Sequence, residues 1–442
     1  MNDPICARIT APGTAAIALI RVSGSSVINL VARFFDRAEK LNRAPSHTLI
    51  FGTFLDSARI PIDEVLISVF RAPHSYTGED VVEISCHGSA QIADRIMATL
   101  LTQTRLANPG EFTLRAYLNG KLDLSRAEAV NDLIQAGSSK AAMAALMQVK
   151  GYLSRHLEGI LEEITDARLR CELAIDFADQ DLPQIDLEDL QQRVQRVLHE
   201  AKALFEEGSH AIKLREGIKI CLAGAPNAGK SSLFNAFLKQ NRAIVTPHPG
   251  TTRDYLEESF SLSGYPIVLY DTAGLRESSD LIEQEGINRS VELMQNADII
   301  LFLYDGAQPE ISPELQSLQG KTIFVASKAD LYPAKKLPVG HVSASVHSPN
   351  GLQALSDSIV AALNLPTEIL ERPMVTNARH LAALQKCITA LTQALDALAL
   401  DAGFEFIAGD LIHAASALED ILGVVPTDAL LGRIFDNFCI GK

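Results

Sequence analysis

The sequence predicts a multi-domain protein with an α+β region at residues 1–118, a split α-helical domain at 119–212 and 365–442, and an inserted α/β domain at 213–364. Three observations predict this fold class. The 442 residues are too many for one compact core. Strand-like apolar runs give way to helical periodicity and then to strands that alternate with helices. The helical pattern resumes after the α/β stretch, which indicates an insertion into one helical domain.

The first two regions differ in where Gly and Pro occur and in the spacing of their apolar residues. Residues 1–118 contain apolar runs such as AAIALIRVSG, EVLISVF and VVEISCHG, separated by Gly and Pro, which predicts several strands. No proline occurs between Pro109 and Pro183, and apolar residues there recur at helical spacing. The Ala- and Leu-rich stripes of 119–212 are typical of a bundle core. The same helical spacing of apolar residues returns after Pro373.

Composition limits the possible partners and the compartment. The net charge of −15 and pI of about 5.2 disfavour non-specific capture of nucleic acid, so an RNA substrate needs a local basic patch or a basic partner protein. The six cysteines include no CxxC pair, which argues against a disulfide framework and a zinc site and fits a reducing cytosol. The sequence shows no signal-peptide pattern and no run of eighteen apolar residues. We therefore expect a cytoplasmic protein with no membrane partner.

A phosphate-binding loop is predicted at the start of the α/β region. GAPNAGKSS follows the strand IKICLA and opens the helix SSLFNAFL, and it matches the loop pattern at Gly224, Gly229, Lys230 and Ser231. The glycines allow backbone N–H groups to surround phosphate oxygens. Lys230 is expected to place a positive charge at the β- and γ-phosphates, and Ser231 is expected to offer a hydroxyl to Mg²⁺. The strand–loop–helix context argues against a chance match.

Later segments predict the rest of a nucleotide site. YDTAG ends an apolar strand, where Asp271 can hold a magnesium-bound water and the Gly274 N–H can contact the γ-phosphate. GTTRD lies between, and Thr252 is the expected second hydroxyl ligand of Mg²⁺. SKAD ends another strand at Asp330, whose carboxylate can accept hydrogen bonds from guanine N1–H and the exocyclic amine, a pattern that adenine does not present. VSAS, with Ser343–Ser345, is expected to complete the base pocket.

The order of these motifs resembles the TRAFAC-class GTPases, which implies a Ras-like P-loop GTPase domain at 213–364. Ser327 stands where that class usually has Asn, so we expect weaker guanine affinity while Asp330 maintains the selectivity. The expected GTP-binding residues are Asn227, Ala228, Gly229, Lys230, Ser231, Ser232, Thr246, Pro247, His248, Pro249, Gly250, Thr251, Thr252, Asp271, Thr272, Ala273, Gly274, Ser327, Lys328, Ala329, Asp330, Ser343, Ala344 and Ser345.

The water-orienting residue of Ras-like proteins is absent. Leu275 follows DTAG where many GTPases place Gln, and a leucine side chain has no polar group with which to orient a water. Hydrolysis therefore needs another polar group and another positive charge. Asn227 is a candidate ligand for K⁺ at the position where an arginine finger would act. It is equally a residue that only makes the loop rigid, and the sequence leaves both roles open.

The whole chain resembles the MnmE (TrmE) family of tRNA-modification GTPases. The resemblance rests on PNAGKSSL, GTTRD, DTAGLRE and the terminal FCIGK, and on PGEFTLRAYLNGKLDL and YTGEDVVEISCHG in the amino-terminal region. It implies a homodimer joined through amino-terminal domains that bind 5-formyl- or methylene-tetrahydrofolate. It also implies a heterotetramer with the flavoprotein MnmG (GidA), which adds an aminomethyl or carboxymethylaminomethyl group to C5 of the wobble uridine of certain tRNAs. K⁺ and GTP would bring the G domains together for hydrolysis.

The resemblance also implies roles for individual residues. K⁺ would be bound by Asn227, Thr246, His248 and Thr251. Mg²⁺ would be bound by Ser231 and Thr252. Glu283 would position the attacking water, and Lys230 would act on the phosphates. The folate-contacting residues would be Arg21, Glu83, Lys121 and Lys442. A carboxylate such as Glu83 can bind the donors of a pterin edge, and the cations can bind the glutamate tail of folate.

The terminal FDNFCIGK contains a candidate nucleophile. DALLGRIFDNFCIGK is amphipathic, so its Leu and Phe residues can pack this end onto a core. Cys439 is then expected to act as a nucleophile or proton-transfer group, with Lys442 lowering its pKa. The other interpretation is a small buried hydrophobic residue. For the whole chain the alternative function is a regulatory GTPase of the Era/EngA ribosome-assembly type without one-carbon chemistry.

Overall fold

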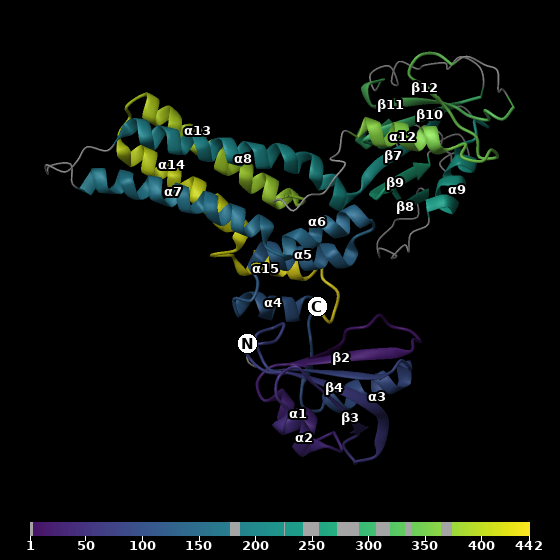
Figure 1. Cartoon of the computed structure of the whole chain (residues 1–442), viewed down its shortest axis with the longest axis vertical. Helices are drawn as coiled ribbons and strands as arrows, with labels where there is room; N and C mark the ends of the chain where they lie inside the picture. Colours follow the sequence, from purple (N-terminus) through teal and green to yellow (C-terminus); the bar gives the residue numbers. More distant parts are fainter. Residues whose placement is uncertain are drawn as a thin grey trace, which may run out of the picture. The chain divides into compact units, whose positions relative to one another are not determined.

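The chain forms two compact units, shown in the computed structural model of Figure 1. One comprises Met1–Asn131 with Glu419–Lys442, and the other comprises Asp132–Leu418. The structure describes residues 3–176, 186–224, 226–241, 256–271, 291–305, 319–331, 337–363 and 374–442. The multi-domain fold class predicted from the sequence is confirmed, whereas the four predicted domain limits stay a prediction.

The first unit is built on a six-stranded sheet in the order β3-β4-β5-β2-β1-β6. Its neighbouring strands are antiparallel except for the parallel pair β1 and β6. The elements are β1 (Ile5–Arg8), β2 (Ile17–Ser23), α1 (Val27–Ala32), α2 (Ala38–Arg43), β3 (Thr48–Leu55), β4 (Pro61–Phe70), β5 (Val81–His87), α3 (Ala90–Leu100), β6 (Arg105–Leu106) and α4 (Glu111–Leu118). The apolar runs that predicted strands correspond to β2, β4 and β5.

Alternation along these strands separates two faces of the sheet. Ile20, Ile67 and Ile84 face a core that also contains residues of α1, α2 and α3. The register places Arg21 opposite Glu83 on the other face. A one-residue shift would exchange the two faces, so the apolar pattern fixes which side chains reach the second face.

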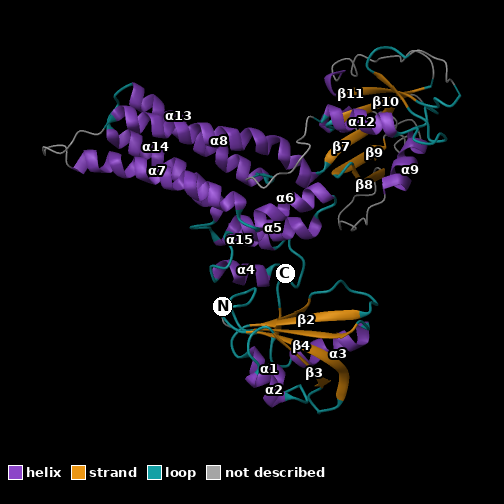
Figure 2. Cartoon of the chain, in the orientation of Figure 1, coloured by secondary structure: helices purple, strands orange, loops and turns teal. Residues whose placement is uncertain are grey.

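Helices dominate the first half of the second unit and return at its end (Figure 2). α8 packs along α7 and α13, so segments far apart in sequence share one bundle, as the split helical domain predicts. Asp186 and Asn377 cap α8 and α13 by accepting backbone N–H bonds, which fixes where these helices begin. The helices with residues in this unit include α5 (Leu124–Gln135), α6 (Ser139–Val149), α7 (Tyr152–Asp176), α8 (Leu187–Glu216), α13 (Ala378–Ala399) and α14 (Phe404–Leu422).

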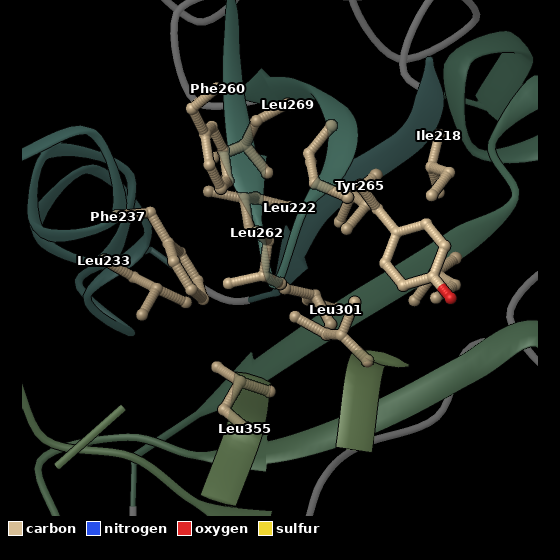
Figure 3. Close-up of a cluster of buried hydrophobic side chains, with 14 of the residues drawn as sticks. Ile218, Leu222, Leu233, Phe237, Phe260, Leu262, Tyr265, Leu269, Leu301 and Leu355 are labelled. Atoms are coloured by element: carbon tan, nitrogen blue, oxygen red, sulfur yellow. The ribbon is translucent and has the colours of Figure 1, made fainter. Parts of the chain in front are cut away.

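The segment between α8 and α13 in the sequence forms a second six-stranded sheet, in the order β12-β11-β10-β7-β9-β8. Its elements are β7 (Ile218–Gly224), α9 (Lys230–Asn241), β8 (Leu256–Leu262), β9 (Tyr265–Asp271), β10 (Ile299–Tyr304), β11 (Thr322–Ala326), β12 (His341–Ser343) and α12 (Gln353–Ala362). Figure 3 shows side chains from these elements packed in one core, including Leu222, Leu269, Leu301, Phe237 and Leu355.

The expected parallel sheet has one antiparallel edge. β8 pairs with β9 in a hairpin, whereas the other neighbouring strands of this sheet are parallel. The turn residues Ser263 and Gly264 have φ values of 51° and 84°. Two consecutive positive φ values are the signature of a tight hairpin turn whose twist matches that of its strands. Among the helices that the structure describes, none is both long and apolar enough to cross a membrane.

Candidate functional site

The phosphate-loop motif leaves the carboxyl end of β7, a central strand of the second sheet. Gly224 ends the strand with a φ of 136°, and a Cβ atom there would lie 2.1 Å from the carbonyl oxygen of Leu303 on β10. Only glycine fits this position, because the neighbouring backbone occupies the space of a side chain. Asn227 and Gly229 also have positive φ values, of 59° and 92°. The chain then enters α9 at Lys230.

Lys230 folds back over this loop. Its side chain is buried, and Nζ donates a hydrogen bond to the carbonyl oxygen of Gly224 at 2.9 Å. The ammonium group is therefore held at the loop, beside the first turn of α9. A helix amino terminus and an ammonium group at one place together favour an anion.

A hydroxyl and a carboxylate meet next to the lysine. Ser231 Oγ donates to Asp271 Oδ2 at 3.3 Å, and Asp271 is 1% exposed. β7 and β9 run parallel, with Leu222 opposite Asp271, so the ends of both strands bring these groups to the same edge of the sheet. Hard oxygen ligands of this kind suit Mg²⁺, which binds through few protein groups and retains water molecules. Ser231 and Asp271 thus fit the ion that the sequence predicts.

A cavity of about 240 Å³ lies between the phosphate loop and the predicted base-binding segments. Asp330 lines it, and Ser345 Oγ donates a hydrogen bond to Asp330 Oδ1 at 2.5 Å. This bond holds the pKa of Asp330 below its ordinary value, against the opposing effect of desolvation. Asp330 is therefore ionised at neutral pH and acts only as an acceptor. The lining residues are Gly229, Ser232, Leu233, Leu303, Val325, Ser327, Lys328, Asp330, Leu331, Ala344, Val346 and His347.

Ser327 contacts the end of β10. Its backbone N–H and its Oγ both donate to the carbonyl oxygen of Tyr304, at 3.0 Å and 3.2 Å. The next residue, Lys328, has a φ of 55° and forms an ion pair of 2.5 Å with Asp305. Ala329 N–H donates to the Ala344 carbonyl at 3.2 Å, which joins the SKAD segment to VSAS. The two base-binding segments predicted from the sequence thus lie together.

Several predicted site residues lie outside the described part of the chain. They are Thr246, Pro247, His248, Pro249, Gly250, Thr251, Thr252, Thr272, Ala273, Gly274 and Glu283. Asn227 is the one predicted K⁺ ligand within the described residues, and its left-handed backbone helps to shape the loop. The roles of these residues stay predictions.

In the first unit, Arg21 and Glu83 form a half-buried ion pair. Arg21 Nε donates to Glu83 Oε1 at 2.9 Å. The guanidinium lies 5.3 Å from the ring centre of Tyr76 and 5.5 Å from that of Phe112. Sequence reasoning missed these two aromatic residues, although they belong to the YTGED and PGEF segments used for the resemblance. Lys121, predicted with this group, donates to the Pro73 carbonyl oxygen at 2.9 Å.

The carboxyl-terminal segment packs onto the same unit. Phe435, at the end of α15 (Asp428–Phe435), and Phe438 are buried with Leu124 and Ala127, as the amphipathic pattern predicts. The Phe112 N–H then donates to the Lys442 carbonyl oxygen at 3.1 Å.

This packing places Lys442 within electrostatic range of the ion pair. Burial lowers the pKa of Lys442 and Arg21 lowers it further, while Glu83 and Cys439 oppose this effect. Three of the four predicted folate residues, Arg21, Glu83 and Lys442, are therefore electrostatically coupled.

Cys439 is the one exposed cysteine of the six, and all six are free thiols. Burial raises the pKa of the Cys86 and Cys171 thiols to about 11. It raises the pKa of Cys221 and Cys387 to about 12. The accessible thiol is thus the one next to the group formed by Arg21, Glu83 and Lys442, which we call the amino-terminal cluster.

Comparison with known proteins identifies the family. The profile described as the GTP-binding protein TrmE N-terminus matches residues 4–121, and the profile of the MnmE helical domain matches residues 124–439. Two relatives named tRNA modification GTPase MnmE match over the full length of both chains. The protein from Moorella thermoacetica is 41% identical, and that from Aquifex aeolicus is 38% identical. This chain belongs to the MnmE family of tRNA-modification GTPases.

Proposed function

We propose that this protein binds and hydrolyses GTP and uses the hydrolysis in tRNA modification. The observation that carries the proposal is the meeting of Lys230, Ser231 and Asp271 at the carboxyl ends of β7 and β9. In this reading Lys230 exchanges its bond to Gly224 for phosphate oxygens, and Ser231 holds Mg²⁺ together with Thr252. A Mg²⁺ ion held by these residues would supply positive charge at the phosphates.

Guanine recognition is assigned to Asp330 and the loop around Ser345. The hydrogen bond from Ser345 Oγ engages Oδ1 and fixes the carboxylate at the cavity. An ionised carboxylate accepts hydrogen bonds from guanine N1–H and the exocyclic amine, whereas adenine offers no such pair of donors. Competition binding with GTP and ATP tests this assignment: guanine preference is expected, and equal affinities would overturn it.

For hydrolysis we propose the potassium mechanism. The residue after DTAG is Leu275, so positive charge must come from outside the usual glutamine position. The proposed K⁺ ligands are Asn227 with Thr246, His248 and Thr251, and the proposed water-positioning group is Glu283. Pairing of two G domains completes the site. Asn227→Ala is expected to remove stimulation by K⁺ while it retains nucleotide affinity, and stimulation that persists would favour a structural role for Asn227.

The amino-terminal cluster is the proposed folate site. Its carboxylate suits the donors of a pterin edge, and its cations suit the glutamate tail. A tetrahydrofolate bound there would supply a one-carbon unit for the wobble uridine, in a reaction performed with MnmG and tRNA. Lys121 would make a further contact to the tail.

Folate binding by the purified chain separates this function from a regulatory GTPase. Titration calorimetry with 5-formyl-tetrahydrofolate is expected to show binding that Glu83→Gln weakens. The exposed Glu64 on the neighbouring strand gives a matched control, Glu64→Gln, which should bind as the wild type does. No binding by the wild-type chain would favour the ribosome-assembly type of GTPase.

A cytoplasmic homodimer joined through the amino-terminal sheet is also proposed. The register puts Leu49, Phe51 and Leu66 on the face of the sheet opposite the core of the first unit, and all three are exposed. Exposed apolar clusters of this kind often mark protein interfaces. Sedimentation velocity is expected to give a dimer that Phe51→Glu dissociates, and a monomeric wild-type protein would contradict the proposal.

Cys439 is the proposed nucleophile or proton-transfer group of the tRNA reaction. It is exposed, and it lies three residues before Lys442 of the amino-terminal cluster. Cys439→Ser should maintain GTP hydrolysis and abolish wobble modification. Normal modification in cells that carry this variant would remove Cys439 from the chemistry.

A further inference from the structure

The turn of the β8–β9 hairpin contacts the beginning of helix α6, within the second unit. Lys140 N–H donates to the carbonyl oxygen of Gly264 at 3.2 Å. A Cβ atom at Gly264 would lie 3.1 Å from Ser139 Oγ and 3.3 Å from Lys140 Cγ. The turn thus fits closely against α6. We call these interactions the hairpin–α6 contact.

The side chain of Lys140 strengthens this contact. Its Nζ lies 3.7 Å from the ring centre of Tyr265, and this tyrosine is 2% exposed. An ammonium group over an aromatic face is an attractive arrangement, and it is stronger where water is excluded. Lys140 therefore contacts the hairpin through both its backbone N–H and its ammonium group.

The same hairpin reaches the nucleotide site at its other end. β9 runs from Tyr265 to Asp271, whose carboxylate accepts the hydrogen bond from Ser231. β8 begins shortly after the GTTRD segment in the sequence. A shift of β9 would therefore change two things. It would alter the distance between Asp271 and Ser231, and it would alter the distances of the hairpin–α6 contact.

The packing next to the contact is incomplete. A cavity of about 260 Å³ is lined by residues from α5, α6, the end of α8 and β9, including Ala141, Arg215 and Pro266. Close-packed interfaces resist rearrangement, whereas a cavity removes part of that resistance. By contrast, the junction between α8 and β7 is closely packed. Gly217 is the one residue between these two elements, and a Cβ atom there would lie 2.7 Å from Val268 Cγ2.

We propose that the hairpin–α6 contact couples the nucleotide site to the helical domain, with Lys140 as a positioning residue that acts on Asp271 through β9. The inference rests on the proposed function, because it requires that the site binds GTP. Coupling is reciprocal: if nucleotide changes the contact, the contact changes nucleotide affinity by the same factor.

Two measurements on the full chain test the proposal. Lys140→Met removes the charge and retains the aliphatic stem, and Lys140→Arg retains the charge. Lys150→Met, at the exposed far end of α6, is the matched control. The first measurement is the ratio of affinities for GMPPNP and GDP, both with Mg²⁺. The second is hydrogen exchange of the α6 amides with and without GMPPNP.

The expected result is a change of about fivefold or more in the affinity ratio for Lys140→Met. Lys140→Arg and Lys150→Met should retain the wild-type ratio. In the wild type, GMPPNP should change exchange at the start of α6, and Lys140→Met should remove this response. A wild-type ratio in Lys140→Met, or unchanged α6 exchange in nucleotide-bound wild type, would overturn the proposal. Absence of GMPPNP binding to the wild type would instead refute the proposed function, so the two failures are distinguishable.

Discussion

Replacement of Arg115 by Met tests how the amino-terminal unit holds α4 in place. Arg115 is 1% exposed, and its guanidinium donates to Glu111 at 2.9 Å, to Glu79 at 3.1 Å and to the carbonyl oxygen of Asp3 at 2.9 Å. Glu111 is also buried and retains its hydrogen bonds from Arg105, so Arg115→Met removes one of the two cations beside Glu111 and the cation beside the largely buried Glu79. The loss of one partner from a buried ion pair costs about 3–5 kcal/mol.

The assay is hydrogen exchange of the slowest amides of β2 and β5, which report opening of this unit. A loss of about 3–5 kcal/mol makes this exchange faster by about two to four orders of magnitude. Arg95→Met is the matched control, because Arg95 is half-exposed and lies 3.6 Å from Asp56. An exposed pair contributes at most about 1 kcal/mol, so the control should change less than about tenfold. A change below tenfold for Arg115→Met would refute the reasoning.

Four further predictions concern the site and its surroundings. Lys230→Ala should lower the GTP hydrolysis rate by about 100-fold or more while circular dichroism stays that of the wild type, and a near-normal rate would remove Lys230 from the phosphate site. Asp330→Asn should weaken GTP binding by about tenfold or more and favour xanthosine triphosphate in competition binding, because the amide can donate to the xanthine 2-oxo group; unchanged guanine preference would place the base elsewhere. Native protein treated with Ellman's reagent should release about one thiol equivalent quickly and Cys439→Ser almost none, because the other five cysteines are buried; several fast thiols would contradict that burial. Burial raises the pKa of Glu111, but hydrogen bonds from Arg105, the Asn108 N–H and Arg115 together outweigh it and hold the pKa below the ordinary 4.5. Its stabilising contribution is therefore complete above pH 4.5 and is lost as the pH falls through the folded-state pKa, so thermal melts of Glu111→Gln should show a weaker loss of stability with acid than the wild type.

The nucleotide site was the most predictable part of the molecule. Phosphate binding demands glycine where the backbone approaches a neighbour, and the close approach of Gly224 to Leu303 is a physical reason for the motif. Lys230 and Asp330 follow in a fixed order after apolar strands, so local patterns suffice to predict their roles. The amphipathic end of the chain was equally readable, because Phe435 and Phe438 repeat at helical spacing.

Contacts between residues that are far apart in the sequence could not be predicted from local patterns. Arg21 meets Glu83 through strand register across 62 residues, and neither Tyr76 nor Phe112 carries a local sign of its contact with Arg21. Arg115 on a short helix looks like an ordinary surface charge until the fold buries it. The antiparallel β8–β9 edge depends on a two-residue turn, whereas the alternation of strands and helices predicts a parallel sheet.

The central claim, a potassium-dependent GTPase, is tested most directly by GTP hydrolysis in matched KCl and NaCl buffers, with ATP as the control nucleotide. We predict strong stimulation by K⁺ with GTP and little turnover of ATP. A GTP hydrolysis rate that is the same in both salts would contradict the potassium mechanism, and equal turnover of ATP would contradict the assignment of Asp330 to guanine recognition.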